Sequence, residues 1–120
     1  MNNIYTFLTF LKTAGLLFAV DLVWFNTGGI YGLKSIEAIQ GEPVHIRYGS
    51  AIIVYLFLAY MLLQTKSAKE AFIYGTCIYG IYDFTCHTVF TRYDWKFAIA
   101  DTLWGGVLFV TSGYLLQLWT

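Results

Sequence analysis

Three aspartates stand inside apolar stretches of this chain, where an ionised side chain is costly. They are Asp21, Asp83 and Asp101. Carboxyl groups in such places usually face the interior of a helix bundle or a water-filled cavity. Carboxylates at close range cannot all ionise cheaply, so a proton or a cation would have to offset their repulsion. These residues therefore suggest an intramembrane acidic pocket that binds or passes a proton or a small cation.

Each aspartate has side chains one helical turn away that could contact it. His87 follows Asp83 at i,i+4 and so shares a helix face with it, which makes it a candidate proton acceptor. The other neighbours are indoles and a phenol, which can donate hydrogen bonds to a carboxyl group. They are Trp24 after Asp21, Tyr79 before Asp83, and Trp104 after Asp101.

The composition indicates which elements position these groups. Charged residues make up 12% of the 120 residues and apolar ones 58%, whereas a water-soluble domain usually has about 25% charged residues. A small domain buries only about 60–70% of the surface of its unfolded chain, so the surplus apolar surface is expected to face lipid. Seven basic residues balance seven acidic ones. We therefore expect a lipid bilayer as partner and no nucleic acid.

The hydropathy pattern predicts a single all-α transmembrane domain over residues 1–120. A spanning helix needs about 20 mainly apolar residues. Four segments qualify, at about 4–25, 48–63, 71–90 and 95–119. The predicted fold is an integral membrane protein of the four-helix bundle type that crosses the bilayer several times.

The first loop has a helical pattern of its own. Apolar residues recur at Ile30, Leu33, Ile36 and Ile39, between polar ones. This spacing predicts an amphipathic helix over about 30–39 that lies at the membrane interface, above the acids. The membrane face of the first and last loops carries four basic residues near the predicted span ends, and the other face carries two. The positive-inside rule therefore predicts that the odd loops are cytoplasmic.

The predicted spans place the three aspartates at one depth. Asp21 lies about four residues before the end of its span, Asp83 about seven before the end, and Asp101 about six after the start. All three ends belong to the same membrane face. At about 1.5 Å per residue the carboxyl groups should lie roughly 6–11 Å below that face and meet in the bundle interior.

Other interpretations of the acids stay open. They could fix helix packing through hydrogen bonds, with no ligand at all. They could form a metal-dependent or acid–base pocket of a lipid-modifying enzyme, with residues 30–39 as a lid. They could also belong to an accessory subunit that contacts a second copy or a larger membrane complex. The residue types do not select a metal or a cofactor.

Three stretches in order resemble one known family. They are "VDLVWFNTGGIYGLKSIEAI", "AFIYGTCIYGIYDFTCHTVF" and "DWKFAIADTLWGG". The set of Asp-x-x-Trp, Tyr-Asp-x-Thr, Trp and Asp-x-x-Trp-Gly resembles the small four-helix membrane proteins called domain of unknown function 2177. The resemblance implies a fold and a membrane location without an activity, and it adds Tyr82 to the side chains expected around Asp83. Cys86 and Lys96 depart from the family pattern, which tends to have Asn and Pro there.

Overall fold

The computed structural model describes the backbone of residues 3–119 and the side chains of residues 6–119. The described part of the chain is all helical apart from its connections. The helices are α1 (Asn3–Phe25), α2 (Ile30–Gln40), α3 (Tyr48–Leu63), α4 (Ala68–Val89) and α5 (Trp95–Trp119). They occupy the segments in which the apolar pattern predicts helices.

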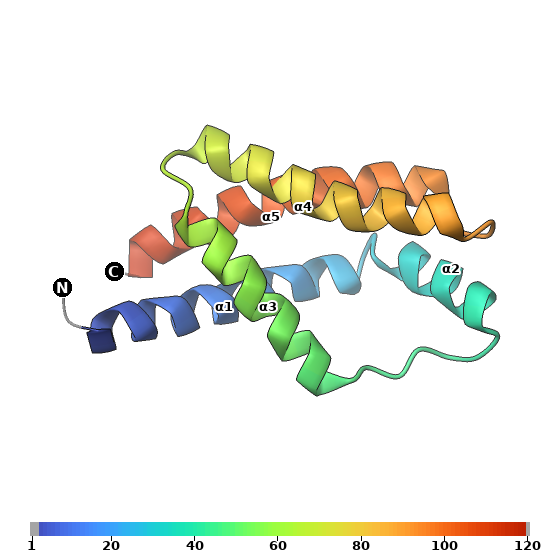
Figure 1. The fold of residues 1–120 in the computed structure, drawn as a ribbon, viewed down its shortest axis with the longest axis horizontal. Coiled ribbons are helices and arrows are strands. Elements are labelled where there is room, and N and C mark those ends of the chain that lie inside the picture. Colours follow the sequence, from blue (N-terminus) through green and yellow to red (C-terminus); the bar gives the residue numbers. More distant parts are fainter. Residues whose placement is uncertain (1–2, 120) are drawn as a thin grey trace.

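Three of the helices run along the long axis of the molecule, and α3 crosses them obliquely. Figure 1 shows α1, α4 and α5 lengthwise, with both termini and the α3–α4 turn at one end. The α4–α5 turn and α2 lie at the other end, where α2 is inclined to the long axis. The extended segment 41–47 leads back from α2, so α3 begins well short of that end. The arrangement is therefore less regular than the expected bundle of four parallel spans.

The pair formed by α4 and α5 is the most closely packed in the molecule. At Gly75 of α4 and Gly105 of α5 the two backbones touch. A Cβ atom added at either glycine would overlap the carbonyl group of the other. Small residues at this crossing allow the close approach of the two backbones. One consequence is that the side chains of Asp83 and Asp101, which lie on these two helices, are held close together.

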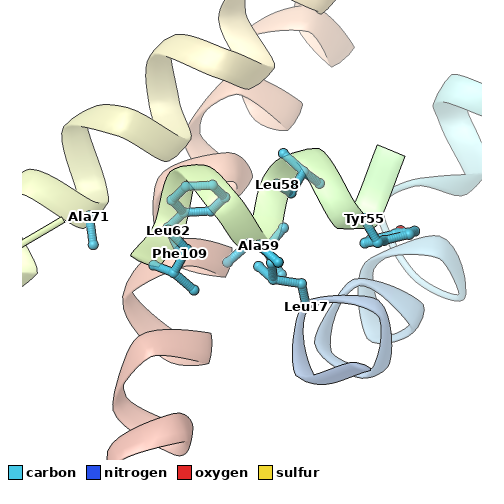
Figure 2. Close-up of a cluster of buried hydrophobic side chains, with 8 residues drawn as sticks. Leu17, Tyr55, Leu58, Ala59, Leu62, Ala71 and Phe109 are labelled. Carbon is cyan, nitrogen blue, oxygen red and sulfur yellow. The ribbon is translucent and has the colours of Figure 1, made fainter. Parts of the chain in front are cut away.

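The apolar core lies where α3 crosses α1 and α5. Figure 2 shows the buried side chains gathered around α3. The members of this core cluster are Leu17, Tyr55, Leu58, Ala59, Leu62, Ala71, Leu108 and Phe109. Contacts between α3 and α4 are few by comparison with those between α1 and α3. Because α3 diverges from α4, a gap between these two helices can reach the interior.

The helix of the first loop is amphipathic, as predicted. Leu33, Ile36 and Ile39 are half-buried, whereas Lys34 and Glu37 are exposed. The helix ends at Gly41, which adopts the left-handed conformation with φ 78° and donates its backbone N–H to the carbonyl of Glu37. This is the usual way for glycine to terminate a helix.

The outer faces of the long helices are apolar and exposed. Phe57, Ile81 and Leu118 each expose about two-thirds of their surface. Within residues 3–119, two helical segments are long and apolar enough to cross a membrane, Thr6–Phe25 and Trp95–Trp119. The apolar helix α3 is shorter, at 16 residues. The four spans expected from hydropathy are thus supported at two positions by length and composition.

Candidate functional site

All three aspartates are buried, as the cost of a charge in an apolar interior predicts. The exposed fraction is 2% for Asp21, 0% for Asp83 and 8% for Asp101. They come from α1, α4 and α5, toward the end of the molecule where the first and last loops lie. We call these three residues, with the tyrosines and tryptophans that bond to them, the acidic cluster.

Asp21 accepts hydrogen bonds from three helices. Its Oδ2 atom accepts from the hydroxyl groups of Tyr55, at 2.6 Å, and Tyr79, at 3.0 Å. Its Oδ1 atom accepts from the indole Nε1 of Trp104, at 2.7 Å. Asp21 acts as acceptor in all three contacts, which suits a carboxylate. This aspartate connects α1 to α3, α4 and α5 at once.

Two Asp-x-x-Trp sequences bond to each other in a reciprocal way. Trp104 of α5 donates to Asp21 of α1, and Trp24 of α1 donates to Asp101 of α5, at 2.7 Å. The two indole rings stack, with centroids 5.3 Å apart and an angle of 10° between their planes. On its other side Trp24 stacks on Phe97, at 6.4 Å. The stack covers the acids toward the end of the molecule where α2 lies.

Asp83 has fewer donors than Asp21. Its Oδ1 atom accepts from the hydroxyl group of Tyr93, at 2.7 Å. Its Oδ2 atom is buried and has no hydrogen-bond donor among the described residues. The side chains of Asp83 and Asp101 nevertheless lie close enough to interact with each other. Two carboxyl groups in such contact form a hydrogen bond only when one of them carries a proton.

Tyr93 closes this part of the cluster from outside the helices. It lies in the connection between α4 and α5 and is 4% exposed. Burial, and after it the hydrogen bond to Asp83, raises the pKa of the Tyr93 hydroxyl above its ordinary value of 10.0. The hydroxyl group therefore remains a donor to Asp83 at every pH near neutrality.

The donors in the acidic cluster are uncharged. They are the hydroxyl groups of Tyr55, Tyr79 and Tyr93 and the indole groups of Trp24 and Trp104. Neutral donors stabilise a carboxylate but leave its net charge unbalanced. Buried charge without a counter-charge is strongly unfavourable. The hydrogen-bond partners of the cluster among the described residues thus provide no counter-charge.

A groove reaches the cluster from the side, between α3 and α4. The volume of this lateral groove is about 350 Å³. A separate pocket near α2 has a volume of about 390 Å³. Asp21 and Asp101 lie in the lining of the lateral groove, together with Val54 and Leu58 of α3 and Ile78 of α4. The lining is thus mostly apolar, and its acidic side chains are those of Asp21 and Asp101. Asp83 is not part of it and is fully buried.

The side chains that the sequence places one turn from each aspartate have other hydrogen-bond partners in the structure. Trp24 and Trp104 bond to the acid on the facing helix instead of the one on their own helix. Tyr79 donates to Asp21 instead of Asp83. Tyr82 is 57% exposed and lies in the lining of the groove. Interhelical contacts, which sequence spacing does not define, determine these pairings.

His87 does not join the cluster, contrary to the sequence-based expectation. It is exposed, and no hydrogen bond joins it to an acid within residues 6–119. Asp83 faces α5, whereas the last turn of α4, which carries His87, is open to the surroundings. A spacing of four residues is therefore not sufficient to bring this histidine to the buried carboxyl group.

Two residues of the cluster were missed by the sequence analysis, Tyr55 and Tyr93. Tyr55 is the only side chain in the central part of the apolar α3 sequence 51–59 that carries a hydroxyl group, which is a signal that could have been used. Tyr93 lies in a five-residue connection, and no helical periodicity places it. Its contact with Asp83 depends on how the chain turns back after α4.

Within the described part of the chain, no group of three or more His, Cys, Asp or Glu side chains is arranged to hold a metal ion. In addition, both oxygens of Asp21 already accept hydrogen bonds. The geometry of the acidic cluster is therefore that of a hydrogen-bonded network.

The sequence model of a family described as "Predicted membrane protein (DUF2177)" matches residues 6–117. The chain belongs to this family. The match covers every residue of the acidic cluster, from Asp21 to Trp104, and it confirms the resemblance seen in the sequence. Searches of curated proteins and of solved structures found no match. DUF2177 membership supports a membrane location and carries no activity.

Proposed function

We propose that this DUF2177 protein binds a proton inside the membrane, between the carboxyl groups of Asp83 and Asp101. The observation that carries the proposal is the buried Oδ2 atom of Asp83, which has no donor although Asp83 lies against Asp101. A proton on either carboxyl group supplies the missing hydrogen bond. It also removes one of the negative charges that the neutral donors leave unbalanced.

The membrane part of the proposal is that α1, α3, α4 and α5 each cross the bilayer. The support consists of the family, the two helices of sufficient length and apolarity, and the exposed apolar side chains. Exposed apolar surface of this extent is unusual in water. By the positive-inside rule we place the end with α2 and the α4–α5 turn in the cytoplasm, because it carries the larger number of basic residues.

Proton exchange needs a route, and the groove provides one. Asp101 lies in the groove lining, whereas Asp83 lies behind it with no exposed surface. A proton would therefore reach Asp101 first and pass to Asp83 over their direct contact. Asp21 accepts three hydrogen bonds, so that in this scheme it holds the helices while the other two acids exchange the proton.

Infrared spectroscopy of the protein in lipid nanodiscs tests the proposal. A protonated carboxyl group has a carbonyl stretch that an ionised one lacks. We expect this band at neutral pH in the wild type, and its loss in both Asp83→Asn and Asp101→Asn, because the new amide can donate to the remaining carboxylate. Asp94→Asn is the control, since Asp94 is exposed. Absence of the band in the wild type would falsify the proposal.

Vesicles distinguish a site that holds a proton from one that passes it. With a pH-sensitive dye inside, proton flux above that of empty vesicles, abolished by Asp101→Asn and retained by Asp94→Asn, would extend proton binding to transport. No flux above empty vesicles would limit the function to binding.

A further inference from the structure

We infer that the lateral groove binds a lipophilic organic cation, an ammonium group attached to an apolar chain, with the charge beside Asp101 and Asp21. The inference rests on the proposed proton site and adds a ligand class to it. In this arrangement the cation and the shared proton compete for the carboxyl group of Asp101.

The charge of the cluster favours a cation as ligand. Its hydrogen-bond donors are all neutral, and the buried Oδ2 of Asp83 has no donor. Asp101, which contacts Asp83, lies in the groove lining. A positive group in the groove would therefore meet the carboxyl group of Asp101, with Asp83 buried behind it, and no cationic side chain bonds to either acid among the described residues.

The geometry favours a bulky cation over a metal ion. No set of ligands for a metal exists among residues 6–119, and Asp21 is already bonded to Tyr55, Tyr79 and Trp104. A small inorganic ion would need several oxygen ligands at short distance. An organic ammonium needs only nearby negative charge and aromatic faces, which attract cations. Tyr82 and Phe25 in the groove lining can contribute such faces.

The walls of the groove favour an apolar chain on that cation. Val54, Leu58 and Ile78 lie in the lining, and Val54 is 51% exposed. The groove opens between α3 and α4, which make few contacts, so it opens sideways to the lipid. Its volume of about 350 Å³ lies at the lower end of the usual range for small-molecule sites, about 300–1,000 Å³. The groove could hold the ammonium head beside the acids and the first part of the chain along the apolar walls, while the rest of the chain extends into the bilayer.

Binding of radiolabelled dodecyltrimethylammonium to the purified protein in nanodiscs tests this inference, with empty nanodiscs as background. A matched pair of variants separates the groove from the lipid surface. Val54→Trp fills the groove, whereas Val107→Trp adds the same ring on the outer face of α5, where Val107 is 45% exposed. We expect Val54→Trp to weaken binding at least about tenfold and Val107→Trp to leave it within about twofold.

Charge and pH provide the second arm of the test. Asp101→Asn should weaken binding at least about tenfold, and binding to the wild type should weaken as the pH falls, because protons then occupy the carboxyl groups. Dodecanol, which has the same chain without the charge, should not displace the bound cation. Equal binding to the wild type and Val54→Trp, or displacement by dodecanol, would overturn the inference.

The two proposals can fail separately. If the infrared band is present in the wild type but the cation does not bind, the inference is wrong and the proton site stands. If the cation binds and Val54→Trp abolishes binding, but no protonated carboxyl group is found, the groove site stands and the proposed proton function is wrong.

Discussion

Within the acidic cluster, the carboxyl groups of Asp21 and Asp83 have different hydrogen-bond environments. Asp21 accepts hydrogen bonds on both oxygens from three neutral donors, whereas Asp83 has one donor, Tyr93, and one oxygen without any. A fully bonded carboxylate in an apolar interior is a structural connection between helices. A carboxyl group that lacks a donor and lies against a second carboxyl group is suited to hold a proton. The same residue type can therefore have two roles within one cluster.

Removing the well-bonded acid should have the largest effect on stability. Asp21→Ala leaves the donors of Tyr55, Tyr79 and Trp104 without an acceptor, so we expect the free energy of unfolding to fall by about 4 kcal/mol. Unfolding by a denaturing detergent, followed by tryptophan fluorescence, measures this. Asp94→Asn should change stability by less than about 0.5 kcal/mol. A loss of less than about 0.5 kcal/mol for Asp21→Ala would contradict the structural role of Asp21 on which the comparison with Asp83 depends.

Two Tyr→Phe variants test the difference in donor number directly. Tyr93→Phe removes the one hydroxyl group that donates to Asp83, and should lower the free energy of unfolding by about 2 kcal/mol. Tyr93 and Tyr55 are similarly buried, at 4% and 8% exposed, so the same unfolding measurement on Tyr55→Phe is a matched control.

The Tyr55→Phe variant should be milder. Asp21 keeps Tyr79 and Trp104 as donors, so we expect a loss of only about 1 kcal/mol. If Tyr55→Phe proves as destabilising as Tyr93→Phe, the number of remaining donors does not decide the effect, and the contrast between the two halves is lost.

Asp83→Asn should change stability least, by less than about 1 kcal/mol, while it removes the proposed proton. The amide keeps the size of the side chain, still accepts from Tyr93 and can donate to Asp101. Unfolding and infrared measurements on the same sample separate the two effects. A loss of several kcal/mol would indicate that the pair is structural, like Asp21.

The free energy of unfolding at alkaline pH provides a further test of the role of Tyr93. Its pKa is raised in the folded protein from the ordinary value of 10.0. The stabilisation is therefore fully present below pH 10.0 and is lost as the pH rises toward the folded-state pKa, because only the unfolded chain releases this proton readily. The difference in unfolding free energy between the wild type and Tyr93→Phe should be constant near neutrality and shrink above pH 10.0.

The positions of the helices and the convergence of the three acids could be predicted from the sequence, but the contacts between them could not. The position of each acid along its helix follows from the helix boundaries, which the apolar pattern defines. Hydrogen-bond partners depend on which faces meet, and Trp24 and Trp104 bond across α1 and α5 although each is one turn from an acid on its own helix. For the same reason Tyr79 was paired with the wrong acid.

The arrangement of α3 and the burial of Tyr93 could not be predicted from periodicity. The α3 sequence is apolar on nearly all sides, so it does not define a face or a crossing angle. Tyr93 contacts an acid ten residues earlier because the chain reverses after α4. His87 illustrates the opposite error, since a favourable spacing near the end of α4 led to a contact that the fold does not make.

The oblique path of α3 has a consequence for the bilayer around it. At about 1.5 Å per residue, its 16 residues extend about 24 Å, and the tilt in Figure 1 makes the depth that they cross smaller still. The hydrocarbon layer is about 30 Å thick, and the irregular backbone of residues 41–47 cannot be exposed to it. For the proposed insertion, lipid beside α3 must therefore be thinner than lipid beside α4 and α5. The cost of hydrophobic mismatch rises with the difference between the apolar length of a helix and the thickness of the bilayer, so α3 should favour partition of the protein into thin bilayers over thick ones.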